Sequence, residues 1–291
     1  GQEKVEYNAQ LCLMNLAVHG LSGVIKSGDE ANTFYHDAHN LDSCCDYVMA
    51  NPPFNVDKVK AESAQSAGRL PFGMPAVNKN KEVSNANYLW ISYFYAYLNE
   101  HGRAGFVMAS SATDSQSKDK DIREKLVRTG HVDVMISVGN NFFYTKSLPC
   151  SLWFFDKGKQ EGLRDKVLFI DARNYYTVVD RTLNEWSEWQ LKNLNAIVWL
   201  YRGEVDKYQN LLSQYRQELH QKISTLIDFQ TESLLHEMLP EFYKKPNEKG
   251  YEIKALLNDG NVLNSLEKLR LGLEEFLRLQ KASVAKFAPY L

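Results

Sequence analysis

The chain of 291 residues has few cysteines, no long hydrophobic run and little net charge. Its four cysteines, Cys12, Cys44, Cys45 and Cys150, form no C-x-x-C pair and are not spaced from histidines as zinc ligands are. We therefore expect reduced thiols in a cytoplasmic protein without a metal site. No apolar run reaches membrane-spanning length and the first residues are not a signal peptide, so no membrane partner is expected.

The net charge of −2 at pH 7 excludes a chain that attracts nucleic acid over its whole surface. Any affinity for DNA must come from local basic patches or from a partner. Glycine-rich loops are also missing, because no G-x-G sequence follows a predicted strand. The apolar fraction is that of an ordinary soluble protein, and the length allows one large core or two modest ones.

The most informative stretch is a short apolar strand over 46–50 that stops at Asn51. Pro52 and Pro53 cannot donate to a strand ladder, so a rigid turn follows the strand. The side-chain oxygen of Asn51 and the carbonyl oxygen of Pro52 can accept both N–H groups of a planar exocyclic amine. Phe54 offers a flat face for the ring that carries this amine. The alternative is a proline-stiffened surface turn without chemistry.

The rest of the first 175 residues alternates between helical and strand patterns. We expect helices over 5–20, 86–99 and 121–128, the second of them amphipathic, and a long loop over 55–82. The expected strands are Thr33–Tyr35, Asp46–Ala50, Gly105–Ala109, Val132–Val138, Ser151–Phe155 and Val167–Ile170. The connection between residues 138 and 151 is too short for a helix, which predicts antiparallel pairing there. The alternation predicts an open α/β sheet.

The pattern changes at about residue 195, which predicts an α/β domain over 1–195 and a helical region over 196–291. Two amphipathic stretches are separated by Lys244–Gly250. Their apolar stripes consist of Leu211, Tyr215, Leu219, Ile223 and Leu226 in the first stretch, and Leu263, Leu266, Leu273, Phe276 and Leu277 in the second. Such a stripe either packs on the chain's own domain or binds a partner subunit.

Taken in order, these motifs resemble the modification (methyltransferase) subunit of type I restriction–modification systems, which methylates adenine N6 in DNA. The resemblance covers about residues 1–175 of the chain. It is carried by Gly1-Gln2-Glu3, Met14-Asn15-Leu16 with His19-Gly20, Asp37, Asn51-Pro52-Pro53-Phe54, Gly102–Val107, and Asn141–Thr145 with Leu148-Pro149. It implies a Rossmann-like methyltransferase fold that uses S-adenosylmethionine.

The resemblance implies that the Asn51–Phe54 turn is catalytic and that double-stranded DNA is the substrate, with the target adenine flipped out of the helix. Phe54 and Phe143 would be the two faces that stack on the flipped base. Phe142 and Tyr144 remain alternatives to Phe143. No general base is required, because the amine can lose its proton after attacking the methyl group, so catalysis would be mostly positioning.

The resemblance also implies cofactor contacts from Glu3 to the ribose, from Asp37 near the adenine, and from Asn51. The alternative for both acids is a solvated loop position. The family's glycine-rich loop would lie upstream of Gly1, so the chain looks like a fragment without the first strand. We therefore expect weak or no binding of S-adenosylmethionine by this chain alone. A second departure is Asn85-Ala86-Asn87, where relatives tend to carry an aspartate.

A modification subunit takes its sequence specificity from a specificity subunit, and the resemblance leaves open whether a restriction subunit accompanies it. The target DNA sequence cannot be read from this chain. Two other hypotheses remain. One is a methyltransferase that acts on another planar amine, in ribosomal RNA (guanine N2) or in a protein glutamine. The other is a non-catalytic scaffold that binds a partner or DNA through the helical tail and the 55–82 loop.

Overall fold

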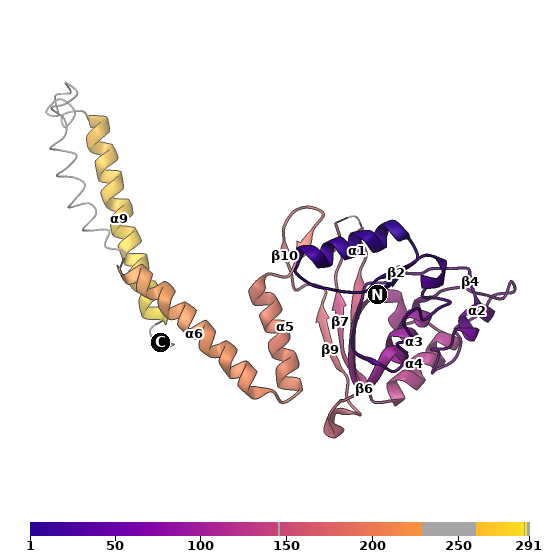
Figure 1. Cartoon of the computed structure of the whole chain (residues 1–291). Coiled ribbons are helices and arrows are strands. Elements are labelled where there is room, and N and C mark those ends of the chain that lie inside the picture. Colours follow the sequence, from indigo (N-terminus) through magenta and orange to yellow (C-terminus); the bar gives the residue numbers. More distant parts are fainter. Residues whose placement is uncertain (145, 229–259, 288, 290–291) are drawn as a thin grey trace. The chain divides into compact units, whose positions relative to one another are not determined.

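The computed structural model describes residues 1–144, 146–228, 260–287 and 289 (Figure 1). The chain forms two compact units, Gly1–Gly203 and Glu204–Leu291. The expected boundary after residue 195 falls inside helix α5 (Glu188–Tyr201). The expected separator Lys244–Gly250 lies outside the described residues.

The first unit is built on a mixed five-stranded sheet with the order β3-β6-β8-β7-β9. Its strands are β3 (Cys45–Ala50), β6 (Leu98–Ala109), β7 (Val132–Val138), β8 (Cys150–Asp156) and β9 (Leu168–Ala172). β3 is parallel to β6 and β7 is parallel to β9, whereas β8 is antiparallel to both of its neighbours. The carboxyl ends of β3, β6, β7 and β9 therefore lie at one edge. The predicted α/β sheet and the antiparallel pairing of β7 with β8 are confirmed.

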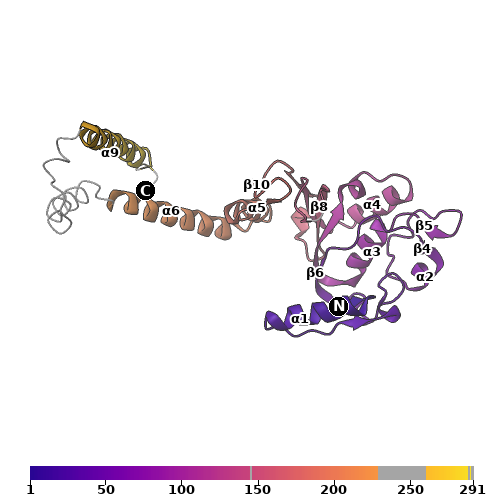
Figure 2. The ribbon, with the colours of Figure 1, turned by 90° about the horizontal axis from the view of Figure 1, so that it is seen from above.

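Helices cover both faces of this sheet. α3 (Asn87–Tyr97) and α4 (Lys118–Arg128) lie on one side and α5 lies on the other (Figure 2). Successive strand residues point to opposite faces, so side chains from the sheet contribute to two hydrophobic cores. Phe106, Trp153 and Phe155 pack in the first core with α3 and α4. Val134, Ile136 and Leu194 pack in the second core beneath α5.

Helix α3 forms where the sequence predicts it, but it is not amphipathic. Nine of its eleven residues are buried. The side that was expected to face solvent is covered by the segment before β3. The ring of Phe34 lies 4.4 Å from that of Trp90, and the Tyr93 hydroxyl donates to the Phe34 carbonyl at 3.0 Å. A helix enclosed on all sides carries no periodic pattern of polar residues.

The same packing explains why the predicted strand Thr33–Tyr35 is wrong, since these residues form a turn. The side-chain oxygen of Asn32 accepts from the Phe34 N–H at 3.1 Å, and the Asn32 carbonyl accepts from the Tyr35 N–H at 2.9 Å. Aromatic residues favour strands, but here they are used to cover a helix. Asp37 consequently follows a turn and not a strand.

The amino-terminal region consists of β1 (Gln2–Glu3), α1 (Glu6–Val18) and β2 (Lys26–Ser27), with β1 parallel to β2. The predicted helix over 5–20 is confirmed. Its apolar side chains are nevertheless exposed, and Ala9 alone among its residues is buried. The exposed apolar residues of α1 are Tyr7, Leu11, Leu13, Met14 and Val18. α1 thus adds little to either core.

The remaining elements are short. They are η1 (Asp29–Ala31), β4 (Val59–Lys60), α2 (Ala61–Ser66), β5 (Glu82–Val83), η2 (Ser110–Thr113), η3 (Glu161–Leu163), β10 (Thr177–Val178) and β11 (Asn184–Glu185). The expected loop over 55–82 is therefore partly wrong, because it contains β4 and α2. Ala61 and Ala64 of α2 are buried. Small buried side chains give a six-residue helix too weak a pattern to be predicted.

The second unit contains α6 (Val205–Asp228) and α9 (Gly260–Phe287), so the predicted helical carboxyl-terminal region is confirmed. Leu212, Tyr215 and Leu219 of α6 share a hollow with Phe287 of α9. The structure does not describe the side chains of Ile223, Leu226, Leu263, Leu266 and Leu273. No helix in the described ranges is long and apolar enough to cross a membrane.

A buried ion cluster joins β7, the turn after β8 and the end of α5. Asp133 accepts from Arg202 Nε at 3.1 Å, and Lys159 Nζ lies 3.9 Å from the other Asp133 oxygen. Lys159 also donates to the Val132 carbonyl at 2.7 Å. The side chains of Asp133 and Lys159 are each 2% exposed. Burial lowers the pKa of Lys159, and the Asp133 carboxylate opposes this shift.

Candidate functional site

The Asn51–Phe54 turn begins where β3 ends, at the carboxyl edge of the sheet. It lines a cavity of about 630 Å³ together with Asn55, Phe143, Lys146 and Leu148. A volume of this size is typical of small-molecule sites, and the carboxyl edge is where open α/β sheets bind ligands. Lys146 is the one charged residue among these lining residues.

The far wall of the cavity comes from the loop between β7 and β8. β6 and β8 separate β3 from β7, so the loop must span about 14 Å, or three strand spacings, to reach the turn. The loop does reach the turn, as the distance of 6.4 Å between the ring centroids of Phe54 and Phe143 shows. Phe143 and Lys146 form a β-bridge that closes the tip of the loop.

A buried asparagine in β11 anchors the base of this loop. The Asn184 N–H donates to the Asn141 carbonyl at 2.6 Å, and its side-chain amide donates to the Asn140 carbonyl at 3.0 Å. Asn184 is 8% exposed. Sequence reasoning missed this anchor because a single asparagine far along the chain gives no signal of its partner.

The three aromatic residues of the loop have different environments. Phe142 packs in the second core, with its ring 5.3 Å from that of Trp186. Phe143 lines the cavity, and Tyr144 is 88% exposed. The planes of Phe54 and Phe143 meet at 78°, edge to face. The two rings therefore lie close together but are not parallel to each other.

The two acidic residues do not line this cavity. Glu3 accepts from the backbone N–H two residues on at 2.8 Å, at the start of α1. One Asp37 oxygen accepts from two N–H groups of the 41–42 turn at 2.7 and 3.0 Å. The Leu41 carbonyl lies 4.0 Å from the thiol of Cys45, the first residue of β3, so Asp37, which binds the Leu41 N–H, lies near the start of that strand. Asn51 lies on the order of 20 Å away along the strand.

The asparagines Asn85 and Asn87 also lie outside the cavity lining. Both side chains bind Asn55, the residue that follows the Asn51–Phe54 turn. They therefore contact the residue next to the turn and not the cavity itself.

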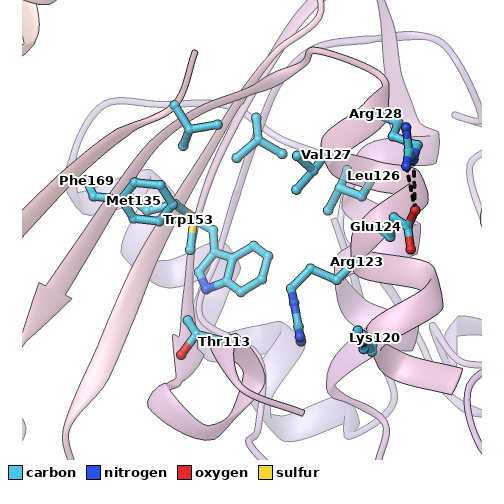
Figure 3. Close-up of a pocket in the computed structure, with 12 residues that line it drawn as sticks. Thr113, Lys120, Arg123, Glu124, Leu126, Val127, Arg128, Met135, Trp153 and Phe169 are labelled. Atoms are coloured by element: carbon cyan, nitrogen blue, oxygen red, sulfur yellow. Dashed lines mark hydrogen bonds and ion pairs between the residues drawn. The ribbon is translucent and has the colours of Figure 1, made fainter. Parts of the chain in front are cut away.

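A second cavity, of about 710 Å³, lies between α4 and the sheet (Figure 3). Trp153 and Met135 line it, and Lys120 and Arg123 are among its lining residues on the helix side. Arg128 is paired with Glu124 at 2.8 Å. None of the site residues predicted from the sequence lines this cavity.

The fold and the turn at the carboxyl edge define a methyltransferase-type α/β domain. The chain superposes on the methyltransferase subunit of a type I restriction–modification system from Streptococcus thermophilus with a TM-score of 0.59. The match has 21% sequence identity and covers 68% of this chain and 41% of that one, and it shows the shared fold. Residues 1–218 match the family described as N-6 DNA Methylase. The chain belongs to this family.

Two relatives extend the comparison. The MjaIX methylase subunit of a type I restriction enzyme from Methanocaldococcus jannaschii is 36% identical over 200 residues. The HindI methylase subunit from Haemophilus influenzae is 28% identical over 188 residues. The matches cover 67% and 64% of this chain, but 34% and 40% of those subunits. The chain thus spans well under half the length of these relatives.

Proposed function

We propose that this chain is part of the modification subunit of a type I restriction–modification complex, and that it transfers a methyl group from S-adenosylmethionine to adenine N6 in DNA. The observation that carries this proposal is the Asn51–Phe54 turn, which lines a cavity of suitable size at the carboxyl edge of the sheet. Membership of the N-6 DNA Methylase family and likeness to type I methylase subunits support it.

In this proposal the chain positions a flipped adenine. The Asn51 side-chain oxygen and the Pro52 carbonyl accept the two N–H groups of the exocyclic amine and draw electron density onto its nitrogen. Phe54 or Phe143 stacks on the base, which is worth about 1–3 kcal/mol, while the other ring meets the base edge. S-adenosylmethionine supplies the electrophilic methyl group when bound. The protein's contribution is alignment of the amine.

The described residues do not offer a single pocket for the cofactor. One oxygen of Asp37 is buried and has no hydrogen-bond partner among the described residues, so it is an available acceptor. It lies at the start of β3, however, and Asn51 lies at the end. Groups at opposite ends of one strand are too far apart to bind the same part of a ligand, so Asp37 and Asn51 do not form one cofactor pocket within the described residues.

The isolated chain is therefore expected to bind S-adenosylmethionine weakly, although the complete subunit uses it. Calorimetric titration should show no saturation up to about 1 mM, which corresponds to binding weaker than about −4 kcal/mol. Micromolar affinity would mean that Asp37 and Asn51 do converge on one pocket. Binding by a longer chain of the same subunit is the positive control.

Lys146 is expected to contact the DNA backbone beside the flipped base, because it lies on the same loop tip as Phe143. Neutralising one phosphate contact, as in Lys146→Gln, should reduce the slope of log affinity against log salt concentration by about 0.9. Fluorescence anisotropy with a DNA duplex at several salt concentrations measures this slope. Lys120→Gln, at the second cavity, should leave it unchanged. An unaltered slope for Lys146→Gln would rule out the phosphate contact.

The proposed activity is tested by product analysis. The assembled complex is incubated with labelled S-adenosylmethionine and unmodified DNA, ribosomal RNA or protein, and the products are hydrolysed. The proposal requires N6-methyladenine from DNA. Methylated guanine from ribosomal RNA or methylated glutamine would replace it with one of the alternative activities. No transfer to any substrate would favour the scaffold hypothesis.

We also propose a division of labour along the chain. Residues 1–195 would act on DNA, and the helical region over 196–291 would bind a specificity subunit that selects the sequence. The hollow lined by Leu212, Tyr215 and Phe287 supports this, since paired helices with apolar side chains at their contact suit docking of a further helix. Copurification of the two subunits, and its loss when residues 204–291 are removed, tests the assignment.

A further inference from the structure

The residue after the catalytic turn, Asn55, has a backbone conformation that most side chains avoid. Its φ angle is +55°, in the left-handed region, which asparagine tolerates better than other non-glycine residues. Its N–H donates to the Asn87 side-chain oxygen at 2.9 Å. Its own side-chain oxygen accepts from Asn87 at 2.9 Å and from Asn85 at 3.0 Å. We call Asn55, Asn85 and Asn87 the asparagine lock.

The orientation of each amide in the lock is determined by its partners. The Asn55 N–H can only donate, so the oxygen of Asn87 must face it. The Asn87 side-chain nitrogen then faces the Asn55 side-chain oxygen, which can only accept. The oxygen of Asn85 accepts from the Asn87 backbone N–H at 2.9 Å. These four bonds therefore fix one orientation for each of the three amides.

The lock connects the catalytic turn to the rigid core. Asn87 is 2% exposed and is the first residue of α3, which is buried on all sides. A backbone bond from the Ala86 N–H to the Val56 carbonyl, 2.8 Å long, reinforces the connection. Asn55 itself lines the cavity next to Phe54, whereas Asn87 does not. Among the described contacts, the Asn87 side chain thus reaches the turn through Asn55.

We propose that Asn87 is a positioning residue for methyl transfer, which acts through Asn55 to fix the Asn51–Phe54 turn relative to the target amine. This inference rests on the proposed function. Alignment accounts for most of the catalysis in that function, so a shift of the turn by about 1 Å is expected to cost on the order of 100-fold in rate.

The chemistry of the lock predicts a graded series of variants. Asn87→Asp keeps an acceptor for the Asn55 N–H but has no N–H to donate, so one side-chain bond of the lock is lost, either that from residue 87 or, if the Asn55 amide turns to meet the carboxylate, that from Asn85. Asn87→Leu removes both bonds. Asn55→Gly retains the positive φ angle and loses only the side-chain acceptor. The double variant Asn55→Gly/Asn87→Leu should be little worse than Asn87→Leu, because both changes break the same contact.

The test measures kcat and KM of the assembled complex on DNA. Asn87→Leu should lower kcat about 10–100-fold, and its KM for DNA should change less than about threefold. The kcat of Asn87→Asp should lie between those of Asn87→Leu and the unaltered protein. The matched control is Asn78→Leu. Asn78 accepts from the Asn80 and Glu82 N–H groups at 2.9 and 3.0 Å in a different turn, so kcat should be unchanged.

Amide hydrogen exchange of the chain alone gives a readout that does not require activity. The Asn55 N–H should be protected in the unaltered protein and in Asn78→Leu, and should lose protection in Asn87→Leu. Unchanged protection or unchanged kcat in every Asn87 variant that folds would overturn the proposal. If Asn51→Ala retains full activity, the proposed function fails instead. Loss of activity in Asn51→Ala with full activity in Asn87→Asp and Asn87→Leu would reject the lock alone.

Discussion

Replacing Asn51 with alanine is expected to lower methyl transfer by at least about 100- to 1,000-fold, the range seen when one preorganised hydrogen-bonding group is removed from a reacting centre. In the proposed function the side-chain oxygen at this position is the acceptor that aligns the target amine, and alanine offers none. DNA affinity should change little, because Lys146 and Phe143 remain. Label transfer from S-adenosylmethionine to DNA by the assembled complex measures the rate.

The matched control for this experiment lies on the neighbouring strand β6, beside the opposite end of β3. Asn99 donates to the Asp46 carboxylate at 2.7 Å, beside the start of β3 and away from the cavity. Asn99→Ala should therefore retain normal activity. If Asn51→Ala also retained it, the chain would be a scaffold and the catalytic group would lie on another chain.

Replacing Asp133 with asparagine is expected to reduce the free energy of unfolding by about 3–5 kcal/mol, which is the usual cost of removing one partner from a buried ion pair. Lys159 would then be a buried cation without its carboxylate. Denaturant unfolding followed by circular dichroism measures the loss. Asp171→Asn is the control, because the Asp171–Arg173 pair is exposed and should be worth at most about 1 kcal/mol.

The pH dependence of this loss identifies its cause. Burial already lowers the pKa of Lys159, and removal of the Asp133 charge should lower it further. A lysine whose pKa is lower in the folded state binds fewer protons there than in the unfolded chain, so stability rises with pH through that interval. The penalty in Asp133→Asn should therefore be largest near neutral pH and shrink as pH approaches about 10. A constant penalty would point to lost packing.

The sequence predicts the strands well where the local residue preferences agree with the structure that the chain adopts. Val132–Val138 has the predicted bounds, and Asp46–Ala50 differs from β3 by one residue. The Asn51 turn follows from the two prolines alone. Errors arise where distant segments decide the structure, as at Phe34, whose role as a cover for Trp90 requires knowledge of α3. At such positions tertiary packing outweighs the strand propensity of the residues.

The site was only partly accessible from the sequence for the same reason. Phe143 could be linked to the turn through the resemblance of its loop, and the structure places the two together. The partners of Asn55 could not be foreseen, since amide–amide pairing between residues 55 and 87 has no local pattern. The sequence placed Asp37 at the end of a strand over 33–35, and that strand is absent from the described structure because those residues form a turn.

The antiparallel course of β8 has a consequence for how such a protein can diversify. Because β7 ends and β8 begins at the same edge, the loop that carries Phe143 and Lys146 starts and finishes at that edge of the sheet. Its length and sequence can change while the sheet's registers stay intact. The turn that carries Asn51 depends instead on α3 and on the core. One wall of the cavity can thus be exchanged during evolution or protein engineering while the other wall remains fixed.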